Sequence, residues 1–234
     1  EYIKDEIFPA ISTAHEDILG FFYGEFIKYS GGDGHSLGIV LTPNHITELF
    51  CDLLEITPKD KVFDPCAGTG SFLISAMNRM LSSVKTKEEK NYIKQNNLHG
   101  IELKENMFSI ATTNMVLRGD GKTNLICTDF LKQDPQELKK NKYSIGMMNP
   151  PYSLRNDKDT ANLSEIHFVK HLLDSLDDNA RCAVIVPQST MVGKNKEDKN
   201  IKKEILKHHT LEGVISLNGD TTFYRVGTIP GIAI

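Results

Sequence analysis

The sequence has few cysteines, and none of them forms a closely spaced pair. Its four cysteines, at positions 51, 66, 127 and 182, stand far apart in a chain of 234 residues, and no CxxC motif is present. Disulfide frameworks and structural zinc sites are built from numerous or closely spaced cysteines, so the sequence disfavours both. Such cysteine usage is typical of a reducing compartment, and we expect a cytoplasmic protein.

Long apolar runs and an excess of positive charge are also missing. No run approaches the roughly 18 apolar residues of a membrane-spanning helix, so the protein is not expected to cross a membrane. Lysine and arginine total 27 against 31 acidic residues, which gives a net charge of −4. A protein with this charge cannot bind nucleic acid tightly through a general attraction between its whole surface and the phosphates. Any binding of nucleic acid must therefore depend on a local patch or a partner.

The sequence does contain enough apolar residues, 39%, for a sizeable core. Apolar residues at helical spacing from Tyr2 to Tyr29 predict an N-terminal helical segment, residues 1–37, ahead of a main domain, residues 38–234. The chain starts with Glu1 rather than Met, and its last residues, GIAI, have the pattern of a strand that is cut short. We therefore expect a fragment whose main domain is truncated at its C-terminal end.

Short apolar strands alternate with amphipathic helices through the main domain. Helices are predicted to begin near 43, 71, 106 and 165. Strands are predicted at 61–64, 98–102, 124–131, 143–149, 181–187, 211–217 and 229–234. This alternation predicts an α/β fold with a mostly parallel sheet. Of the two polar stretches, 82–97 is expected to be a loop or a helix extension. The lysine-rich stretch 193–207 is expected to be a solvated loop, with contact to DNA phosphates as the alternative.

A glycine-rich turn joins the first strand to the next helix, and its residues are Ala67, Gly68, Thr69, Gly70 and Ser71. Glycine allows a positive φ and a close approach of the backbone to a ligand. A phosphate loop would need Lys-Ser or Lys-Thr after the last glycine, and the dinucleotide fingerprint GxGxxG is absent, so both are set aside. Asp64, just before the turn, suits a positively charged or hydroxyl-bearing ligand, because a carboxylate repels phosphate.

Two further strands also end in a carboxylate. Glu102 ends the second strand, where an acidic side chain can accept both hydroxyls of a ribose. Asp129 and Phe130 end the third strand, where they can supply an acceptor for an exocyclic amine and an apolar wall for an adenine ring. Because the carboxyl ends of parallel strands meet at one edge, the three carboxylates predict a single nucleoside-bearing ligand.

The fourth strand ends in a stiff turn of four residues, Asn149, Pro150, Pro151 and Tyr152. Proline fixes φ and has no backbone donor, so the Asn149 side-chain oxygen and the Pro150 carbonyl are held as two neighbouring acceptors. Such a pair suits an NH2 group on a planar base, and hydrogen bonds to both of its protons favour a nitrogen lone pair that is free to attack. Tyr152 offers a face for stacking of that base.

In this order, the segments LTP, DPCAGTGSF, GIE, TDF and NPPY resemble the class I methyltransferases that modify the 6-amino group of adenine in DNA. More narrowly, the helical lead-in and the motif spacing resemble the modification subunit of type I restriction-modification systems. The resemblance implies a Rossmann-like α/β domain that uses S-adenosylmethionine and no metal. It also implies double-stranded DNA as substrate, and a DNA-specificity subunit and a restriction subunit as partners, with two modification subunits flanking one specificity subunit.

Carried over to this sequence, the resemblance gives each motif a role. Leu41, Thr42 and Pro43 would clasp the methionine part of the cofactor. Asp64 and the glycine turn would surround its amino acid and sulfonium, Glu102 its ribose, and Asp129 with Phe130 its adenine. The NPPY residues would hold the flipped target base. The family's second aromatic clamp has only Phe223 or Tyr224 as weak matches here, and it is expected beyond the end of this chain.

Other interpretations stay open. Proteins with NPPY also methylate glutamine side chains or RNA, and a cofactor-binding module without catalysis could serve only for assembly. His167 and His171, four residues apart on a predicted helix, could bind a metal in principle. No third ligand accompanies them, so a pair on the helix surface is favoured.

Overall fold

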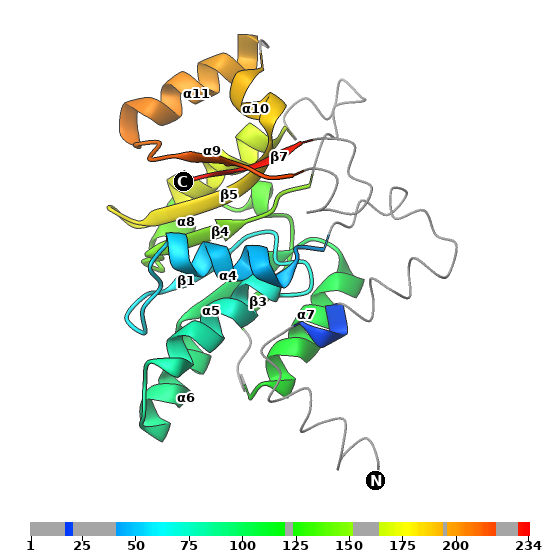
Figure 1. Cartoon of the computed structure of the whole chain (residues 1–234), viewed down its shortest axis with the longest axis vertical. Coiled ribbons are helices and arrows are strands. Elements are labelled where there is room, and N and C mark those ends of the chain that lie inside the picture. Colours follow the sequence, from blue (N-terminus) through cyan, green and yellow to red (C-terminus); the bar gives the residue numbers. More distant parts are fainter. Residues whose placement is uncertain (1–16, 21–40, 120–123, 152–163, 194–195, 219–228) are drawn as a thin grey trace, which may run out of the picture.

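The computed structural model describes residues 17–20, 41–119, 124–151, 164–193, 196–218 and 229–234 (Figure 1). In chain order, the strands of the sheet are β1 (Val62–Asp64), β2 (Leu98–Glu102), β3 (Asn124–Cys127), β4 (Ile145–Met148), β5 (Arg181–Pro187), β6 (Val214–Ser216) and β7 (Pro230–Ala233). The helices are α4 (Asn44–Leu53), α5 (Ser71–Ser82), α6 (Lys87–Asn96), α7 (Glu105–Leu117), the 3-10 turn η2 (Phe130–Lys132), α8 (Pro135–Lys139), α9 (Glu165–Ser175), α10 (Gln188–Val192) and α11 (Lys196–His208).

The strands form one sheet with the order β3-β2-β1-β4-β5-β7-β6. The first five strands are parallel to one another, and β7 lies antiparallel between β5 and β6. The predicted mostly parallel α/β fold is therefore confirmed. From β1 the chain adds β2 and β3 on one side of the sheet, and it then returns to add β4 and β5 on the other side. Open parallel sheets bind their ligands at such a switch point, here between β1 and β4, at the carboxyl ends of the strands.

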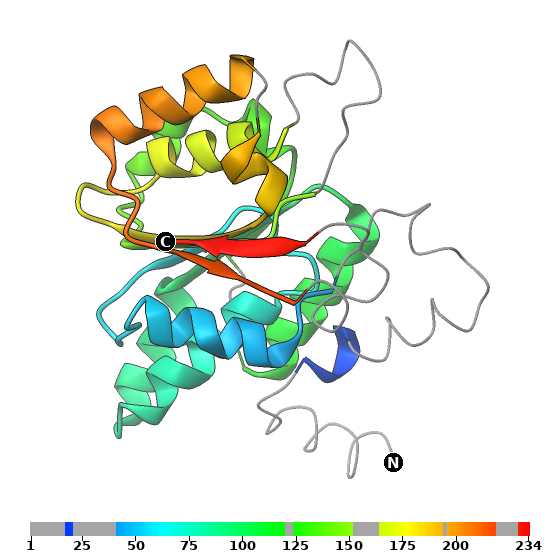
Figure 2. The ribbon, with the colours of Figure 1, turned by 45° about the horizontal axis from the view of Figure 1, so that its top comes forward.

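Helices cover both faces of the sheet (Figure 2), and the strand residues alternate between two cores. Val62, Met147 and Ile185 point into the core under α4 and α5, whereas their neighbours Phe63 and Met148 point into the core under α9. This period of two explains why the strand sequences are apolar almost throughout, since both of their faces are buried.

Two polar stretches that the sequence assigned to solvated or loop-like structure are helical. Residues 87–96 form α6, which starts with a capping box in which Thr86 and Glu89 exchange hydrogen bonds. The loop prediction for 193–207 is wrong for 196–207, which lies in α11. Glu197 and Asp198 lie in its first turn and Lys207 and His208 in its last, as the helix dipole favours. Lys202 Nζ donates to the carbonyl of Thr190 in α10 at 2.8 Å.

The third strand is shorter than predicted, and the helices are all of modest length. The strand ends at Cys127, and Asp129 caps the 3-10 turn that follows it. The predicted helices from Tyr2 to Tyr29 lie outside the described residues except for 17–20, and so do Phe223 and Tyr224. Within the described ranges, no helix is long and apolar enough to cross a membrane.

Candidate functional site at the carboxyl edge of the sheet

The glycine turn between β1 and α5 has the backbone conformation that its sequence predicts. Gly68 has a φ of +55° and Gly70 a φ of +85°, both in the left-handed region that favours glycine. The Ala67 N–H donates to the carbonyl of Ile101 at the end of β2, at 2.9 Å. The turn is thereby held against the neighbouring strand, at the carboxyl edge of the sheet.

Glu102 ties the end of β2 to this turn. Its two carboxylate oxygens accept hydrogen bonds from the backbone N–H of Gly68 and from that of Lys104, each at 2.8 Å, and the residue is 9% exposed. Each carboxylate oxygen has a second acceptor position, so the side chain keeps capacity for a ligand. The predicted meeting of the glycine turn and the second strand-end carboxylate is present in the fold.

Asp64 is fully buried and only half satisfied. The Cys66 N–H donates to its Oδ1 at 3.1 Å, and its Oδ2 has no hydrogen-bond partner in the part of the chain that the structure describes. Burial raises the pKa of the Asp64 carboxyl to about 8, with a smaller rise from the negative charge of Glu102 and a partial offset from the Cys66 N–H. The end of β1 therefore presents an acceptor that a cation or a donor could fill.

Asp129 belongs to the same group of carboxylates, whereas the Phe130 ring is directed into the core. The pKa of Cys66 is raised well above its ordinary value by burial, and then by the charges of Asp64, Glu102 and Asp129. The Asp129 side chain caps η2 by accepting from the Leu131 N–H at 3.1 Å. Phe130 is 3% exposed and packs edge-on against His171, so little of its ring can contact a ligand in this conformation.

The acceptor turn after β4 is linked to the segment before α4. The Asn149 Nδ2 donates to the Thr42 hydroxyl at 3.1 Å, and the buried Asn149 Oδ1 has no partner among the described residues. Leu41 and Pro43 flank Thr42 and are half-buried, with Pro43 at the start of α4. Pro150 and Pro151 follow Asn149, whereas Tyr152 lies outside the described residues.

A polar cluster beside the glycine turn was not foreseen from the sequence. The Asp17 carboxylate accepts hydrogen bonds from the Thr69 hydroxyl, from the Gly20 N–H at 2.7 Å and from Asn114 Nδ2 at 2.7 Å. Asn114, fully buried on α7, also donates to the Thr69 carbonyl at 2.9 Å. Asp17 thus connects the described part of the N-terminal segment to the middle of the turn. No local motif signals this contact, because the partners are distant in sequence.

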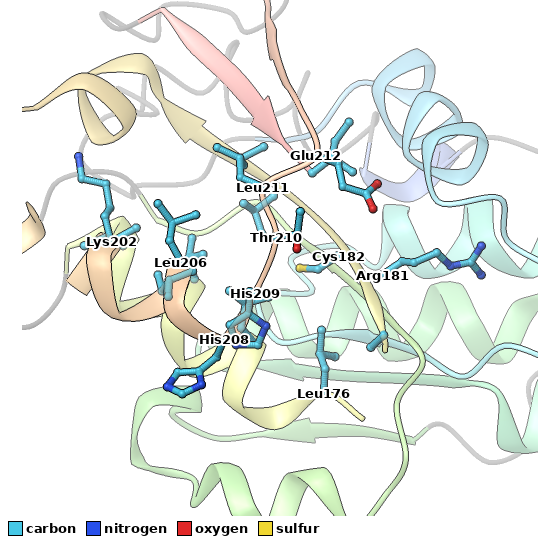
Figure 3. Close-up of a pocket in the computed structure, with 18 of the residues that line it drawn as sticks. Leu176, Arg181, Cys182, Lys202, Leu206, His208, His209, Thr210, Leu211 and Glu212 are labelled. Carbon is cyan, nitrogen blue, oxygen red and sulfur yellow. The ribbon is translucent and has the colours of Figure 1, made fainter. Parts of the chain in front are cut away.

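Two other features lie apart from this edge. His171 is half-buried, because its ring packs against Phe130 and its Nε2 is buried. His167 is also half-buried, and its Nδ1 contacts the Ser164 hydroxyl at 2.5 Å. A cavity of about 740 Å³ lies beneath α11, where Leu176, Cys182 and Leu206 surround it (Figure 3). None of the residues predicted for the site lines this cavity.

Comparison with protein families tests the resemblance to adenine-modifying DNA methyltransferases that the sequence motifs suggest. The family described as N-6 DNA methylase matches residues 14–234, which include every residue of the site. The chain belongs to the N-6 DNA methylase family. The resemblance that the motifs carry is thereby confirmed at the level of the family.

Relatives of this N-6 DNA methylase include both type II and type I enzymes. The type II restriction enzyme and methyltransferase RM.BcgI of Heyndrickxia coagulans is 55% identical over 235 residues, which cover 99% of this chain and 36% of that protein. The methylase subunit of the type I restriction enzyme EcoEI from Escherichia coli is 24% identical over 220 residues, covering 88% of this chain and 44% of that one.

Solved structures with the same fold include a modification subunit of a type I restriction enzyme. The subunit from Vibrio vulnificus YJ016, described as part of a putative type I enzyme, matches with a TM-score of 0.75 and 20% identity, over 92% of this chain and 48% of that one. A likeness at this identity shows the shared fold. The N-6 DNA methylase chain spans less than half the length of these three proteins.

Proposed function

We propose that this chain is the catalytic part of a methyltransferase that transfers a methyl group from S-adenosylmethionine to the 6-amino group of adenine in DNA. The observation that carries the proposal is the buried, unpartnered Oδ1 of Asn149 beside Pro150, at the same sheet edge as the glycine turn and the three carboxylates. Family membership, over residues 14–234, supports the same reaction.

The residues at the edge fit S-adenosylmethionine. Its ammonium and sulfonium groups are cationic, and the unpartnered Asp64 Oδ2 is an acceptor that such a group can satisfy. The glycines with positive φ have no side chains, so a ligand can approach the backbone of the turn closely beside that carboxylate. Glu102 would accept hydrogen bonds from the ribose hydroxyls, and Asp129 would accept one from the adenine amine. The segment Leu41 to Pro43 would hold the methionine end. When bound, the cofactor supplies an electrophilic methyl group.

Asn149 and Pro150 would act on the acceptor. An exocyclic amine on an aromatic base is a weak nucleophile, because its lone pair is delocalised into the ring. Two acceptors, the Asn149 Oδ1 and the Pro150 carbonyl oxygen, would each take a hydrogen bond from one N–H of that amine and favour a pyramidal nitrogen. Tyr152, which follows in sequence, is proposed to stack on the flipped base. Transfer would then be direct, with no covalent enzyme intermediate.

DNA recognition is proposed to depend on further protein. The net charge of −4 leaves little general attraction for a phosphate backbone, and extrusion of a base costs a few kcal/mol. A DNA-specificity subunit that grips the duplex on both sides of the target could provide that energy, with two methylating subunits around it. A restriction subunit would complete an assembly of the type I kind.

A second arrangement is favoured by one comparison. The relative that is 55% identical is named as a restriction enzyme and a methyltransferase together, and the present chain matches 36% of its length. The full protein could therefore combine DNA cleavage and methylation in one polypeptide. Incubation of the full protein with unmethylated DNA and Mg²⁺, without any restriction subunit, separates the two arrangements: cleavage supports one polypeptide, and intact DNA supports a separate subunit.

The test of the proposed function is the transfer of radioactive methyl from S-adenosylmethionine by the full protein with its specificity partner. Unmethylated duplex DNA, RNA and a release-factor-like protein are offered as acceptors, and label is expected in the DNA. Asn149→Ala should lower the transfer rate about a hundredfold or more, as the loss of one preorganised group in an active site does, while calorimetry finds cofactor affinity nearly unchanged.

A matched control is Asn96→Ala, since Asn96 is an exposed asparagine on α6 whose side chain donates to the Tyr92 carbonyl of the same helix. This variant should keep the wild-type rate. Label in RNA or protein instead of DNA would reject the substrate. Near-normal turnover by Asn149→Ala would mean that NPPY is only a structural turn, and cofactor binding without transfer to any acceptor would favour an inert assembly module.

A further inference from the structure

We propose that the Thr42 hydroxyl orients the Asn149 side-chain amide, so that the amide oxygen and not the amide nitrogen faces the acceptor base. This inference rests on the proposed function and assigns Thr42 a task beyond holding the cofactor. The two residues are 107 positions apart in sequence, yet Asn149 Nδ2 donates to Thr42 Oγ1 at 3.1 Å.

Orientation matters because the two ends of a carboxamide have nearly the same shape and opposite hydrogen-bonding character. The oxygen accepts and the nitrogen donates, and a half-turn about the last side-chain torsion exchanges them with little change in volume. An amino group on the target base can bond to the oxygen but meets a repulsive pair of donors if the nitrogen faces it. Hydrogen bonding around the amide must therefore select one orientation.

In the structure, the orientation is the one that catalysis requires. The nitrogen of Asn149 bonds to Thr42, and the oxygen is buried without a partner. A buried acceptor without a partner is unfavourable until a donor reaches it, so this oxygen is an open position for an N–H of a ligand. Because Thr42 bonds to the amide nitrogen, the Asn149 Oδ1 stays available to accept a hydrogen bond from a ligand.

A hydroxyl can donate as well as accept, so the contact alone would tolerate the opposite orientation. Thr42 has only one hydroxyl proton. If that proton is given to a group that only accepts, the hydroxyl oxygen can only accept, and the amide nitrogen must face it. The carboxylate of the cofactor, which is proposed to lie near Leu41 to Pro43, is such a group. Cofactor binding would then fix Asn149 in the orientation that recognises an amine.

The variants for the test are Thr42→Val and Thr42→Ser. Valine has nearly the shape of threonine without the hydroxyl, whereas serine keeps the hydroxyl and loses only a methyl. Thr47→Val is the matched control, because Thr47 is a buried threonine of α4 whose hydroxyl bonds to the Asn44 carbonyl at 2.9 Å and to the Ser75 hydroxyl at 2.7 Å, away from Asn149. It removes a buried hydroxyl without touching the amide.

The first readout is the single-turnover rate of methyl transfer to DNA at saturating S-adenosylmethionine, for the full protein with its partner. Thr42→Val should lower the rate about tenfold, the factor that corresponds to one net hydrogen bond. Thr42→Ser should restore most of it, and Thr47→Val should leave it unchanged. Combining Thr42→Val with Asn149→Ala should reduce the rate no further than Asn149→Ala alone, because Thr42 acts through Asn149.

The second readout is base preference, which a purely structural role would not move. Once the methylated adenine has been mapped in product DNA, duplexes with adenine or hypoxanthine at that position are compared for binding, with S-adenosylhomocysteine present. Hypoxanthine carries a carbonyl in place of the amine, so it suits an amide that has turned its nitrogen inward. The preference for adenine should fall severalfold in Thr42→Val and persist in Thr42→Ser.

Several outcomes would overturn the inference. Equal losses in the valine and serine variants would show that the hydroxyl is not the cause. Weaker cofactor binding with an unchanged saturated rate would mean that Thr42 serves the cofactor alone. Independent losses in the double variant would separate Thr42 from Asn149. Failure of the wild-type protein to methylate any DNA is distinguishable from all of these, since it would reject the proposed function and the inference with it.

Discussion

Binding of S-adenosylmethionine should release a proton from Asp64. The carboxyl has a pKa of about 8 because it is buried, with a contribution from nearby Glu102. With that pKa, about nine-tenths of the molecules carry the proton at pH 7 in the free protein. A cation placed against the unpartnered Oδ2 favours the ionised form, so binding at pH 7 should expel close to one proton from this side chain.

The affinity should follow from the same linkage. Below the pKa of Asp64, each fall of one pH unit should weaken binding about tenfold through this group, and above about pH 8 the dependence should vanish. Calorimetry in two buffers of different ionisation enthalpy measures the proton count. Asp64→Asn is the comparison, since it keeps the shape and removes the titration, and the difference between the two proteins cancels protons released by the cofactor itself.

Asp64→Asn should bind the cofactor more weakly, by about 1–3 kcal/mol for a lost charge-assisted hydrogen bond, and should release about one proton fewer at pH 7. Equal proton release by both proteins would refute the reasoning, because Asp64 would then be ionised before binding or remote from the cofactor.

The stability of the free protein gives an independent check. The folded pKa is raised above the unfolded one, so this group stabilises the fold at low pH and that stabilisation is lost between about pH 4 and pH 8. Asp64→Asn should flatten this dependence in thermal melts.

Two further predictions concern the support of the cofactor site. Glu102→Ala should weaken S-adenosylmethionine binding by about 1–3 kcal/mol in calorimetry, because it removes the proposed ribose acceptor and the partner of the Gly68 N–H together; unchanged affinity would reject the proposed pocket. Asp17→Ala should weaken the same binding severalfold, because Thr69 loses its carboxylate partner. Asp52→Ala, at an exposed carboxylate on α4, is its control, and equal effects of the two variants would reject a role for Asp17 in positioning the turn.

The parts of the fold that depend on local patterns could be predicted from the sequence. The strands β1, β2, β4 and β5 are apolar runs bounded by turn residues, and the amphipathic helix α9 follows its period of 3.6. Because parallel strands share one carboxyl edge, the end residues of these strands also predicted which side chains would meet. Asp64 and Glu102 lie together for this reason.

Features that depend on contacts between residues far apart in the sequence could not be predicted from local patterns. The lysine-rich helix α11 has many charged residues and only a narrow apolar stripe, so its pattern is close to that of a solvated loop. The contacts of Asp17 with Asn114 and of Thr42 with Asn149 join residues 97 and 107 positions apart. No periodicity records such pairs. Phe130 shows another limit: it lies in the turn η2 after β3, near the predicted edge of the sheet, but the direction of its ring depends on packing against His171.

The two unpartnered oxygens at the carboxyl edge restrict what the site can hold. Asn149 Oδ1 is a buried acceptor, and so is Asp64 Oδ2 once its carboxyl is ionised; each is then expected to cost about 1–3 kcal/mol until a donor reaches it. A phosphoryl or carbonyl oxygen would add repulsion at Asn149 Oδ1 and at the ionised Asp64 carboxylate, whereas a cation or an N–H would remove the cost. The edge therefore selects a pair of ligands that both bring positive charge or hydrogen-bond donors. A sulfonium cofactor with an ammonium group and a base with an exocyclic amine satisfy that requirement together, and an acceptor that offered only oxygen would satisfy just half of it.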